Sequence, residues 1–363
     1  MNRRRLIAHL DMDAFYVACE LLRRPELKGK PVIVAGRGSR AVVTTASYEA
    51  RRFGVGSAMP AARARTLCPD GIYLPPDFTH YRAKSREVMA LIGGLKVPME
   101  PVSLDEVYLD LSETPYPIEE MSTLVRRISA DLGLDASVGI GPNKLIAKVA
   151  SDAEKPRGFV VLTREQAVER FAGESPRLIP GIGPKTSERL ASYGVKTLGQ
   201  LQRCTLSGLI ERFGEHHGRE LHDRAHFRSA SRVARRKAKS RSVEATFDTD
   251  IADLGELEAI LRRQSRDLAK GLAKNGNRGR TIAIKVRLDD FTTLTRARTI
   301  PEMTNDETVI TEVALDLLRA NRPERPVRLL GVRVGSFEED EKPGKPTAEP
   351  GQTALTLPPA EAA

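Results

Sequence analysis

Alternation of apolar and polar positions is clearest in the last third of the chain. Residues 281–288 place every second side chain on one apolar face, which predicts a half-buried β-strand. Those side chains are Ile282, Ile284, Val286 and Leu288. Residues 253–273 and 306–320 instead carry apolar residues at helical spacing. Further strands are predicted at 242–247, 293–300 and 327–334, so residues 242–337 have the order βαββαβ of a small split βαβ domain.

The first 167 residues predict short strands mixed with helices. Apolar runs predict strands at 5–10, 31–36, 40–46 and 137–141, and two short strands within 102–111. Helices are predicted at 48–53, 79–94 and 119–132, and another from about 143. From about residue 168 the pattern changes to short helices, and 179–201 is typical of two helices joined by a glycine hairpin. The sequence has no internal repeat, and it indicates an α+β chain of several domains.

Size and charge narrow the class of protein. A chain of 363 residues is long enough for two to four domains. Its formal net charge of +10 favours a polyanionic partner, although a merely soluble basic protein would share it. Three scattered cysteines form neither a disulfide framework nor a CxxC metal pair, which fits a cytoplasmic protein. Asp11 interrupts the first apolar run too early for a signal peptide, and no stretch is suited to crossing a membrane.

Two polar segments frame the last domain. Residues 224–241 carry eight basic residues and no acidic one, which is typical of a linker rather than a core element. Residues 338–363 are rich in Glu, Pro and Ala, which predicts a disordered tail.

Acidic residues follow apolar strands at two places. Asp11 ends the first predicted strand, and Asp105 and Glu106 form an acidic corner between two others. Neighbours on a regular strand point to opposite faces, so these carboxylates can converge only at a strand end or turn. Converging carboxylates repel unless cations offset them, and oxygen ligands suit Mg²⁺. Two such ions can support phosphoryl or nucleotidyl transfer. Acidic pairs are nevertheless common on protein surfaces, so the pattern alone indicates only a possible metal site.

Four motifs give the chain a family resemblance. They are LDMDAFYVACE at 10–20, TTASYEARRFGV at 44–55, SLDEVYLDLS at 103–112 and GPNKLIAKVASDAEKP at 141–156. In this order and separation they closely resemble the Y-family DNA polymerases, most of all the bacterial DNA polymerase IV branch. The resemblance covers about residues 6–336 and implies a right-hand polymerase fold with an added little finger domain. The implied domains are a palm (1–17 and 78–167), fingers (18–77), a thumb with a helix-hairpin-helix (168–230), a basic linker (231–241) and the little finger (242–337).

The resemblance also implies the catalytic roles. Asp11 and Asp105 would bind two Mg²⁺ ions, Glu106 would bind the catalytic ion near the primer 3′-OH, and the backbone carbonyl of Met12 would be a further ligand. Asp13 belongs to the motif, but we interpret it as a local hydrogen-bond acceptor.

The nucleotide contacts follow from the same motifs. Tyr16 matches the steric gate that excludes a 2′-OH and so favours dNTPs over ribonucleotides. The matches to triphosphate contacts are Thr45, Tyr48, Arg51 and Lys155, with Lys148 as a weaker candidate. Tyr48 and Arg51 are three residues apart, so they share a helix face and can both reach phosphate oxygens. Small residues near the nascent base pair, which suit damaged templates at the expense of fidelity, are Val43, Thr44 and Ala58.

Candidate contacts to primer-template DNA lie further along the chain. In 180–186 the candidates are Gly181, Gly183 and Lys185, where a helix start would offer free amides to phosphate. In the linker they are Arg235, Arg236 and Lys237. On one face of the last sheet they are Arg280, Lys285, Arg287, Arg296 and Arg298. The tail holds a degenerate sliding-clamp motif, Gln352, Leu355 and Leu357, with Pro358 in place of the usual Phe. The protein is expected to be a monomer.

Two other classes of function remain open from the residues alone. A palm-domain nucleotidyl cyclase would share the acids and metals, but it would need neither the hairpin nor the basic linker, and its Gly-Gly-rich signature is missing. A non-enzymatic DNA-binding scaffold is disfavoured because all three acids are intact.

Overall fold

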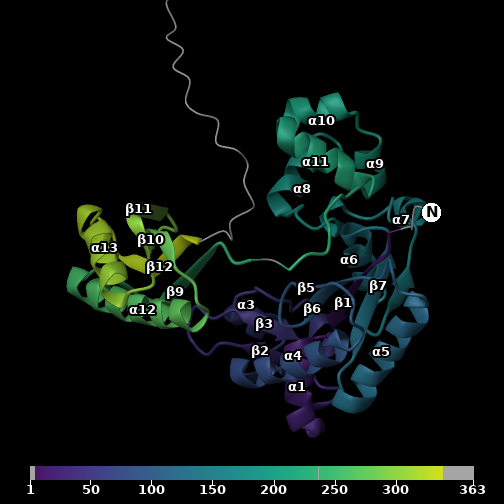
Figure 1. Cartoon of the computed structure of the whole chain (residues 1–363), viewed down its shortest axis with the longest axis horizontal. Helices are drawn as coiled ribbons and strands as arrows, with labels where there is room; N and C mark the ends of the chain where they lie inside the picture. Colours follow the sequence, from purple (N-terminus) through teal and green to yellow (C-terminus); the bar gives the residue numbers. More distant parts are fainter. Residues whose placement is uncertain (1–4, 236, 338–363) are drawn as a thin grey trace, which may run out of the picture. The chain divides into compact units, whose positions relative to one another are not determined.

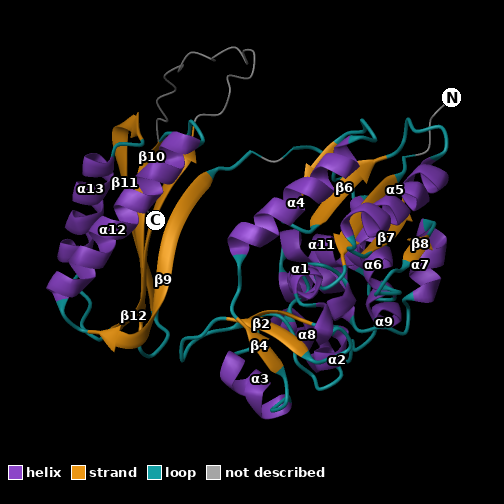
Figure 2. Ribbon diagram, turned by 90° about the horizontal axis from the view of Figure 1, so that it is seen from below, coloured by secondary structure: helices purple, strands orange, loops and turns teal. Residues whose placement is uncertain are grey.

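Two compact units make up the computed structural model, which describes residues 5–235 and 237–337 (Figures 1 and 2). The boundary between the units falls after Arg236. Within the described residues, none of the helices has the length and apolar character needed to cross a membrane.

A five-stranded sheet forms the centre of the first unit. Its strand order is β5 (Met99–Pro101), β6 (Glu106–Asp110), β1 (Ile7–Met12), β7 (Ala136–Gly141) and β8 (Phe159–Val161). All neighbours are antiparallel except β7 and β8. Strand β1 extends through Asp11 and Met12, beyond the predicted end at residue 10, because both residues pair with neighbouring strands on their backbone.

The two faces of this sheet have different coverings. Ala8, Leu10 and Met12 of β1 pack in one apolar core with α4 (Phe78–Gly93) and α5 (Pro117–Leu132), and α1 (Phe15–Arg23) joins the same core. The opposite face receives α6 (Lys144–Asp152). Gly139 allows this close approach, because a Cβ there would lie 2.1 Å from the carbonyl oxygen of Ala147. The alternate residues His9 and Asp11 therefore face α6.

A three-stranded sheet lies between α1 and α4 in the chain. Its order is β3 (Val43–Ala46), β2 (Val32–Ala35) and β4 (Ile72–Leu74), accompanied by η1 (Pro25–Leu27), α2 (Tyr48–Arg51) and α3 (Ala61–Leu67). Helix α2 begins after Ser47, whose side chain accepts a hydrogen bond from the backbone N–H of Ala50. It is shorter than the predicted 48–53. Strand β4 and helix α3 were not predicted, because they are too short to show a hydrophobic period.

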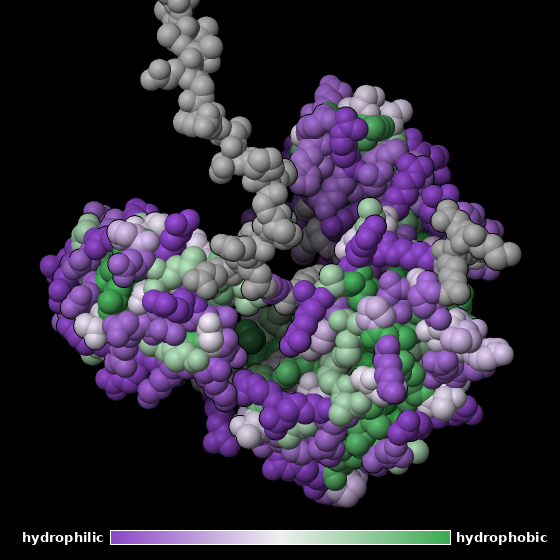
Figure 3. Space-filling model, viewed as in Figure 1, coloured by the Kyte–Doolittle hydropathy of each residue, from purple (hydrophilic) through white to green (hydrophobic). Residues whose placement is uncertain are grey.

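Short helices complete the first unit, as the sequence indicated from residue 168. They are α7 (Arg164–Arg170), η2 (Pro176–Leu178), α8 (Pro184–Ser192), α9 (Leu198–Gln202), α10 (Leu206–Phe213) and α11 (Glu215–Ala225). The visible face of α8–α11 is mostly hydrophilic (Figure 3). The basic segment 224–241 is not a linker throughout, because α11 continues to Ala225 and β9 already begins at Ser240.

The second unit has the predicted βαββαβ order. Its sheet runs β11 (Thr293–Thr304), β10 (Gly279–Leu288), β12 (Val327–Phe337) and β9 (Ser240–Ile251), with antiparallel neighbours throughout. Helices α12 (Leu254–Lys274) and α13 (Glu307–Ala320) pack on one face (Figure 2). The predicted apolar face of β10 is buried against these helices, which shows that the alternation in 281–288 was a sound guide.

Candidate active site

One cavity of about 310 Å³ in the first unit collects the candidate catalytic and nucleotide-binding residues. It lies where β1 ends, beside the start of α1, the β3–α2 junction, the β5–β6 loop and α6. The candidates that line it are Asp11, Met12, Tyr16, Thr45, Tyr48, Arg51, Asp105, Glu106, Lys148 and Lys155. Residues from four separate sequence motifs thus reach one hollow.

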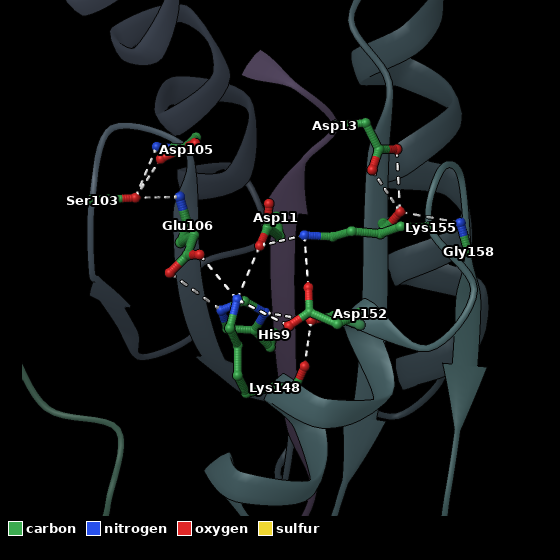
Figure 4. Close-up of polar contacts among 12 residues, drawn as sticks. His9, Asp11, Asp13, Ser103, Asp105, Glu106, Lys148, Asp152, Lys155 and Gly158 are labelled. Atoms are coloured by element: carbon green, nitrogen blue, oxygen red, sulfur yellow. Dashed lines mark hydrogen bonds and ion pairs between the residues drawn. The ribbon is translucent and has the colours of Figure 1, made fainter. Parts of the chain in front are cut away.

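Asp11 and Glu106 are direct partners across the β1–β6 ladder, and they share a lysine (Figure 4). The Nζ of Lys148 lies 3.0 Å from Oδ2 of Asp11 and 2.9 Å from Oε1 of Glu106. A second ammonium group, that of Lys155, lies 2.7 Å from the same Oδ2 of Asp11. The pair of carboxylates therefore already binds cationic groups.

Asp152 holds both lysines from the other side. Its Oδ1 lies 2.8 Å from Lys155 Nζ and its Oδ2 lies 3.5 Å from Lys148 Nζ. The sequence prediction did not include Asp152. Its position four residues after Lys148 was the available signal, because this spacing brings side chains together on a helix. Lys155 lies beyond the end of α6.

Asp105 lies in the loop just before β6, so it need not follow the alternation of the strand. Its backbone carbonyl accepts a hydrogen bond from the N–H of Met12 at 3.0 Å. Its carboxylate bonds to the hydroxyl of Ser103, which also accepts from the N–H groups of Asp105 and Glu106. The turn stabilised by Ser103 is what lets two consecutive acids line the same cavity.

Two opposing effects set the pKa values of the carboxylates: burial raises them, and the neighbouring lysines lower them. Burial alone would raise the pKa of Asp11, but Lys148 and Lys155 outweigh burial and lower that pKa. Burial raises the pKa of Asp105, and the negative charge of Asp11 adds to the rise. The pKa of Glu106 is also raised, because burial outweighs the attraction of Lys148. Both lysines have raised pKa values because the attraction of Asp11 outweighs their own burial, so they stay charged.

His9 is a buried member of the site that sequence reasoning missed. It lies two residues before Asp11 on β1 and is 0% exposed. The hydroxyl of Ser151 donates to the carbonyl of Lys148 at 2.8 Å, so at 2.8 Å from His9 Nδ1 it accepts the ring N–H. The other nitrogen, Nε2, lies 3.9 Å from Oε2 of Glu106 and has no hydrogen-bond partner among the described residues. Burial, followed by the charge of Lys148, lowers the pKa of His9 to about 3.

The donor set fits a hard divalent cation. Asp11, Asp105 and Glu106 supply carboxylate oxygens around one cavity, which are the ligands that Mg²⁺ prefers. The ammonium group of Lys148 occupies a cation position between two of them. His9, Asp11 and Glu106 also offer ligand atoms within 4.8 Å of one another.

Tyr16 stands on a stack of aromatic rings beside the carboxylates. Its ring lies 4.6 Å from that of Tyr81 at an interplanar angle of 19°, and 5.9 Å from the ring of Phe78. Tyr81 is itself fixed by donating its hydroxyl proton to Glu20 at 2.8 Å. Burial raises the pKa of Tyr16, so the phenol stays neutral. A ring supported in this way can act as a rigid wall of the cavity.

Tyr48 and Arg51 share one face of α2, as their spacing predicted. The guanidinium carbon of Arg51 lies 4.5 Å from the centre of the Tyr48 ring, and its Nε donates to the carbonyl of Ala46 at 3.0 Å. Thr45, at the end of β3, is 7% exposed and also reaches the cavity. Thr44 lines the cavity as well, whereas Val43 is buried in the small sheet.

The glycine hairpin before α8 is present, and one of its two glycines has a positive φ. Gly181 has φ +93°, a conformation that favours glycine, whereas Gly183 is extended and its N-cap position does not need one. Lys185 is exposed in the first turn of α8. Arg235 and Lys237 are exposed, and Arg236 lies outside the described residues.

We predicted that the basic residues of the second unit share one face of the sheet. This prediction was wrong, because they are divided between the two faces. Arg296 is paired with Ile284 and Arg298 with Ile282, which places both on the helix-covered side. Arg296 donates to Asn321 at 2.8 Å, and Arg298 lies 3.1 Å from Asp316 of α13. The error arose because residues of two strands were assigned to one face before the register between the strands was known.

The opposite, open face of this sheet keeps two of those residues. Lys285 and Arg287 of β10 pair with Thr295 and Thr293 of β11, and Arg333 of β12 shares their face. Arg280 is exposed beside the irregular start of β10. The candidate clamp residues Gln352, Leu355 and Leu357 lie outside the described residues.

Comparison with known proteins shows the family. The impB/mucB/samB family matches residues 10–152, its C-terminal domain matches residues 238–347, and the thumb domain of DNA polymerase iota matches residues 177–226. DNA polymerase IV of Methanoculleus marisnigri is 40% identical over 92% of this chain and 95% of its own length. The chain belongs to the Y-family of DNA polymerases.

Two further comparisons support this membership. DNA polymerase IV of Stenotrophomonas maltophilia is 41% identical over 94% of this chain and 95% of its own length. A solved Y-family DNA polymerase chimera of Dbh and Dpo4 superposes with a TM-score of 0.81 and 27% identity, covering 92% of this chain and 99% of that one. The polymerase is therefore a DNA-directed DNA polymerase of the DNA polymerase IV type, with an α+β right-hand fold and a little finger domain.

Proposed function

We propose that this polymerase copies a DNA template, including damaged DNA, by transferring a nucleotidyl group from a dNTP to the primer 3′-OH with two Mg²⁺ ions. The 3′-oxygen would attack the α-phosphorus, the bond from the α-phosphorus to the bridging oxygen would break to release pyrophosphate, and the proton of the 3′-hydroxyl would pass to water. The observation that carries the proposal is the pairing of Asp11 with Glu106 around a shared cation, in a cavity that also holds Asp105. This arrangement favours the polymerase over a DNA-binding scaffold without activity.

The carboxylates would divide the work of holding the metals. Asp11 and Asp105 would bind both ions, Glu106 would bind the ion nearest the primer end, and the carbonyl of Met12 would be a further ligand. Bound divalent ions in such sites stabilise negative charge on the attacking and leaving oxygens. Lys148 would leave the space between Asp11 and Glu106 and keep its contact with Asp152, which lies on the same helix face.

The dNTP would lie between the palm and the fingers. Tyr48, Arg51 and Thr45 would bind the triphosphate from one side, and Lys155 would bind it from the other. Tyr16 would lie under the deoxyribose and exclude a 2′-OH. Thr44 adds a small side chain to the lining, which supports tolerance of irregular base pairs at the cost of fidelity.

Primer-template DNA would be held mainly through its phosphates. The hairpin at Gly181 and Gly183 with Lys185 would bind one backbone, and Arg235, Arg236 and Lys237 would follow the connecting segment. In the little finger, Arg280 and Arg287 lie on or beside the open face, whereas Arg296 and Arg298 would act from the sheet edge. Such binding is nonspecific in sequence and weakens steeply with salt.

The remaining proposals concern organisation and partners. We propose that the domain limits given by the resemblance hold, except that the little finger begins with β9 at Ser240, that the protein works as a monomer in the cytoplasm, and that Gln352, Leu355 and Leu357 bind a sliding clamp. Deleting residues 350–363 should then leave distributive synthesis intact and reduce stimulation by the clamp. Equal stimulation of both forms would refute the clamp contact.

Primer extension tests the central proposal. The wild-type protein should extend a primed template with Mg²⁺, and Asp105→Asn should not, although both should bind the DNA equally. A panel of templates with and without lesions extends the same assay to bypass. Equal extension by both proteins, or by neither, would contradict the proposal.

A further inference from the structure

Asp13 is buried next to the catalytic site, but none of the roles above uses it. Its side chain is 5% exposed, and its carboxylate lies apart from the Asp11–Lys148–Glu106 contacts (Figure 4). The hydroxyl of Tyr48 donates to Oδ1 at 3.2 Å, and the backbone N–H of Arg157 donates to Oδ2 at 2.8 Å. The hydroxyl of Ser137 lies 2.9 Å and 3.1 Å from the two oxygens. Three separate elements thus donate to one carboxylate.

Two of these contacts fix the loop that carries Lys155. Arg157 follows Lys155 by two residues and has φ +59°, a backbone conformation that residues other than glycine rarely adopt. The bond from its N–H to Asp13 helps to hold that conformation. Ser137 extends the anchor, because its Oγ also accepts from the N–H of Gly158 at 3.1 Å. The loop after α6 is therefore tied to Asp13 directly and through Ser137.

The third contact fixes the ring of Tyr48 in the wall between two cavities. Tyr48 lines the catalytic cavity and also a second cavity of about 370 Å³, whose lining includes Val17, Leu21 and Asp13. Burial and the charge of Asp13 raise the pKa of Tyr48, so its hydroxyl keeps the proton that it donates. Without the bond to Asp13, the ring would have space to leave the catalytic side.

We propose that Asp13 is a positioning residue that fixes Tyr48 of the fingers and the Lys155 loop of the palm relative to each other. One buried carboxylate then sets both sides of the triphosphate pocket. The inference rests on the proposed function, since it assumes that Tyr48 and Lys155 contact the triphosphate. Asp13 acts through these residues and touches neither metal nor substrate.

An isosteric change can separate position from charge. In Asp13→Asn, the amide oxygen can still accept from the rigid N–H of Arg157, and the amide nitrogen can donate to the oxygen of Tyr48. This reversal keeps the ring in place and frees the hydroxyl proton for a phosphate. Asp13→Ala removes every contact. Rescue by Asn is therefore the signature of positioning.

Single-turnover primer extension tests the proposal, because it measures the dissociation constant for dNTP separately from the maximal rate. Asp13→Ala should raise the dissociation constant about tenfold with little change in rate, and Asp13→Asn should bind dNTP as tightly as wild type or more tightly. In a Tyr48→Phe background the effect of Asp13→Ala should shrink. Tyr73→Phe is the matched control, because it also removes a fingers hydroxyl, one that donates to a carbonyl at 3.3 Å.

Thermal unfolding shows whether Asp13→Ala folds, and a second variant is available if it does not. If Asp13→Ala fails to fold, Ser137→Ala tests the loop side and should weaken dNTP binding in the normal chain but not together with Lys155→Ala. The inference is overturned if Asp13→Asn binds dNTP as weakly as Asp13→Ala, or if the effects of Asp13→Ala and Tyr48→Phe simply multiply. Normal dNTP binding by Tyr48→Phe and Lys155→Ala would overturn both the inference and the triphosphate contacts of the proposed function, whereas the first two outcomes leave those contacts intact.

Discussion

The sheet around Asp11 and the sheet of the second unit use charged residues in opposite ways. In the second unit many charges form separate pairs at the surface, such as Lys285 with Glu244 and Arg266 with Glu307. Around Asp11, which is itself buried, they are shared, because two lysines and three carboxylates contact one another. Removing one member of a surface pair costs little free energy of unfolding. Removing a buried carboxylate that several cations share costs more, because each cation loses a counter-ion.

Removing the shared carboxylate should have the largest effect. Asp11→Ala would leave Lys148 and Lys155 with Asp152 as their remaining common partner and would remove the main proposed metal ligand. We expect the rate of primer extension to fall by about 10³-fold, equivalent to about 4 kcal/mol of activation free energy. Glu258→Gln is the control, because it removes the charge of an acid held by Arg319 at 2.7 Å in the second unit. Similar losses of activity in both variants would contradict the comparison.

The buried histidine should make the stability of the first unit depend on pH. The pKa of His9 lies at about 3, below its ordinary value of 6.5, because the fold buries the neutral ring. As pH falls below about 6.5, the unfolded chain binds a proton at His9 and the folded chain does not, so the free energy of unfolding decreases. Between pH 7 and pH 5 this loss should be about 2 kcal/mol.

Urea unfolding of wild type and His9→Gln at both pH values checks this prediction. The variant should lose less stability on acidification, because glutamine does not titrate. Equal losses in the two proteins would show that His9 does not carry the effect. The second unit, whose charged groups are largely exposed, should show a weaker dependence.

Sugar selection should respond to the aromatic stack more moderately. Tyr16→Ala removes the wall that Tyr81 and Phe78 support, so incorporation of ribonucleotides relative to dNTPs should rise about tenfold or more, equivalent to about 1.4 kcal/mol. Competitive single-nucleotide incorporation with matched dNTP and ribonucleotide measures this ratio. Unchanged discrimination would remove Tyr16 from the proposed gate.

Breaking a surface pair in the second unit should have the smallest effect. Glu244→Gln removes the partner of Lys285, which lies 3.1 Å away, and both side chains are exposed. The free energy of unfolding should change by less than about 1 kcal/mol, and the difference should vanish at high salt. Urea unfolding at low and high salt measures it, and a large or salt-independent loss would show that the two regions are less different than the contacts indicate.

The same contrast explains what the sequence could predict. The second unit follows a regular amphipathic pattern, so its element order and the buried face of β10 were predicted correctly. The face of Arg296 and Arg298 was not, because the pattern of one strand does not specify its register with the next. In the first unit the motifs led to Asp11, Asp105 and Glu106, and the structure places all three around one cavity.

Other residues of the first unit were missed because their importance depends on tertiary contacts. His9 looked like an ordinary strand residue, and only the packing of α6 makes it a buried neighbour of Glu106. Asp152 lies within the motif at 141–156, and Ser137 lies on a strand, but only the folded structure shows that they contact Lys155 and Asp13. Asp13 was predicted as a local hydrogen-bond acceptor, yet its partners come from α2, β7 and the loop after α6.

Lys148 also affects the polymerase between reactions, when no metal is bound at the proposed site. The ammonium groups of Lys148 and Lys155 already offset the charges of Asp11 and Glu106, so we expect the chain to fold without a bound metal. A metal bound at the proposed site would have to displace Lys148, which could return when the metal leaves. We therefore expect metals to exchange quickly rather than remain bound. The concentration of free Mg²⁺ would then set the fraction of the polymerase that is ready to react.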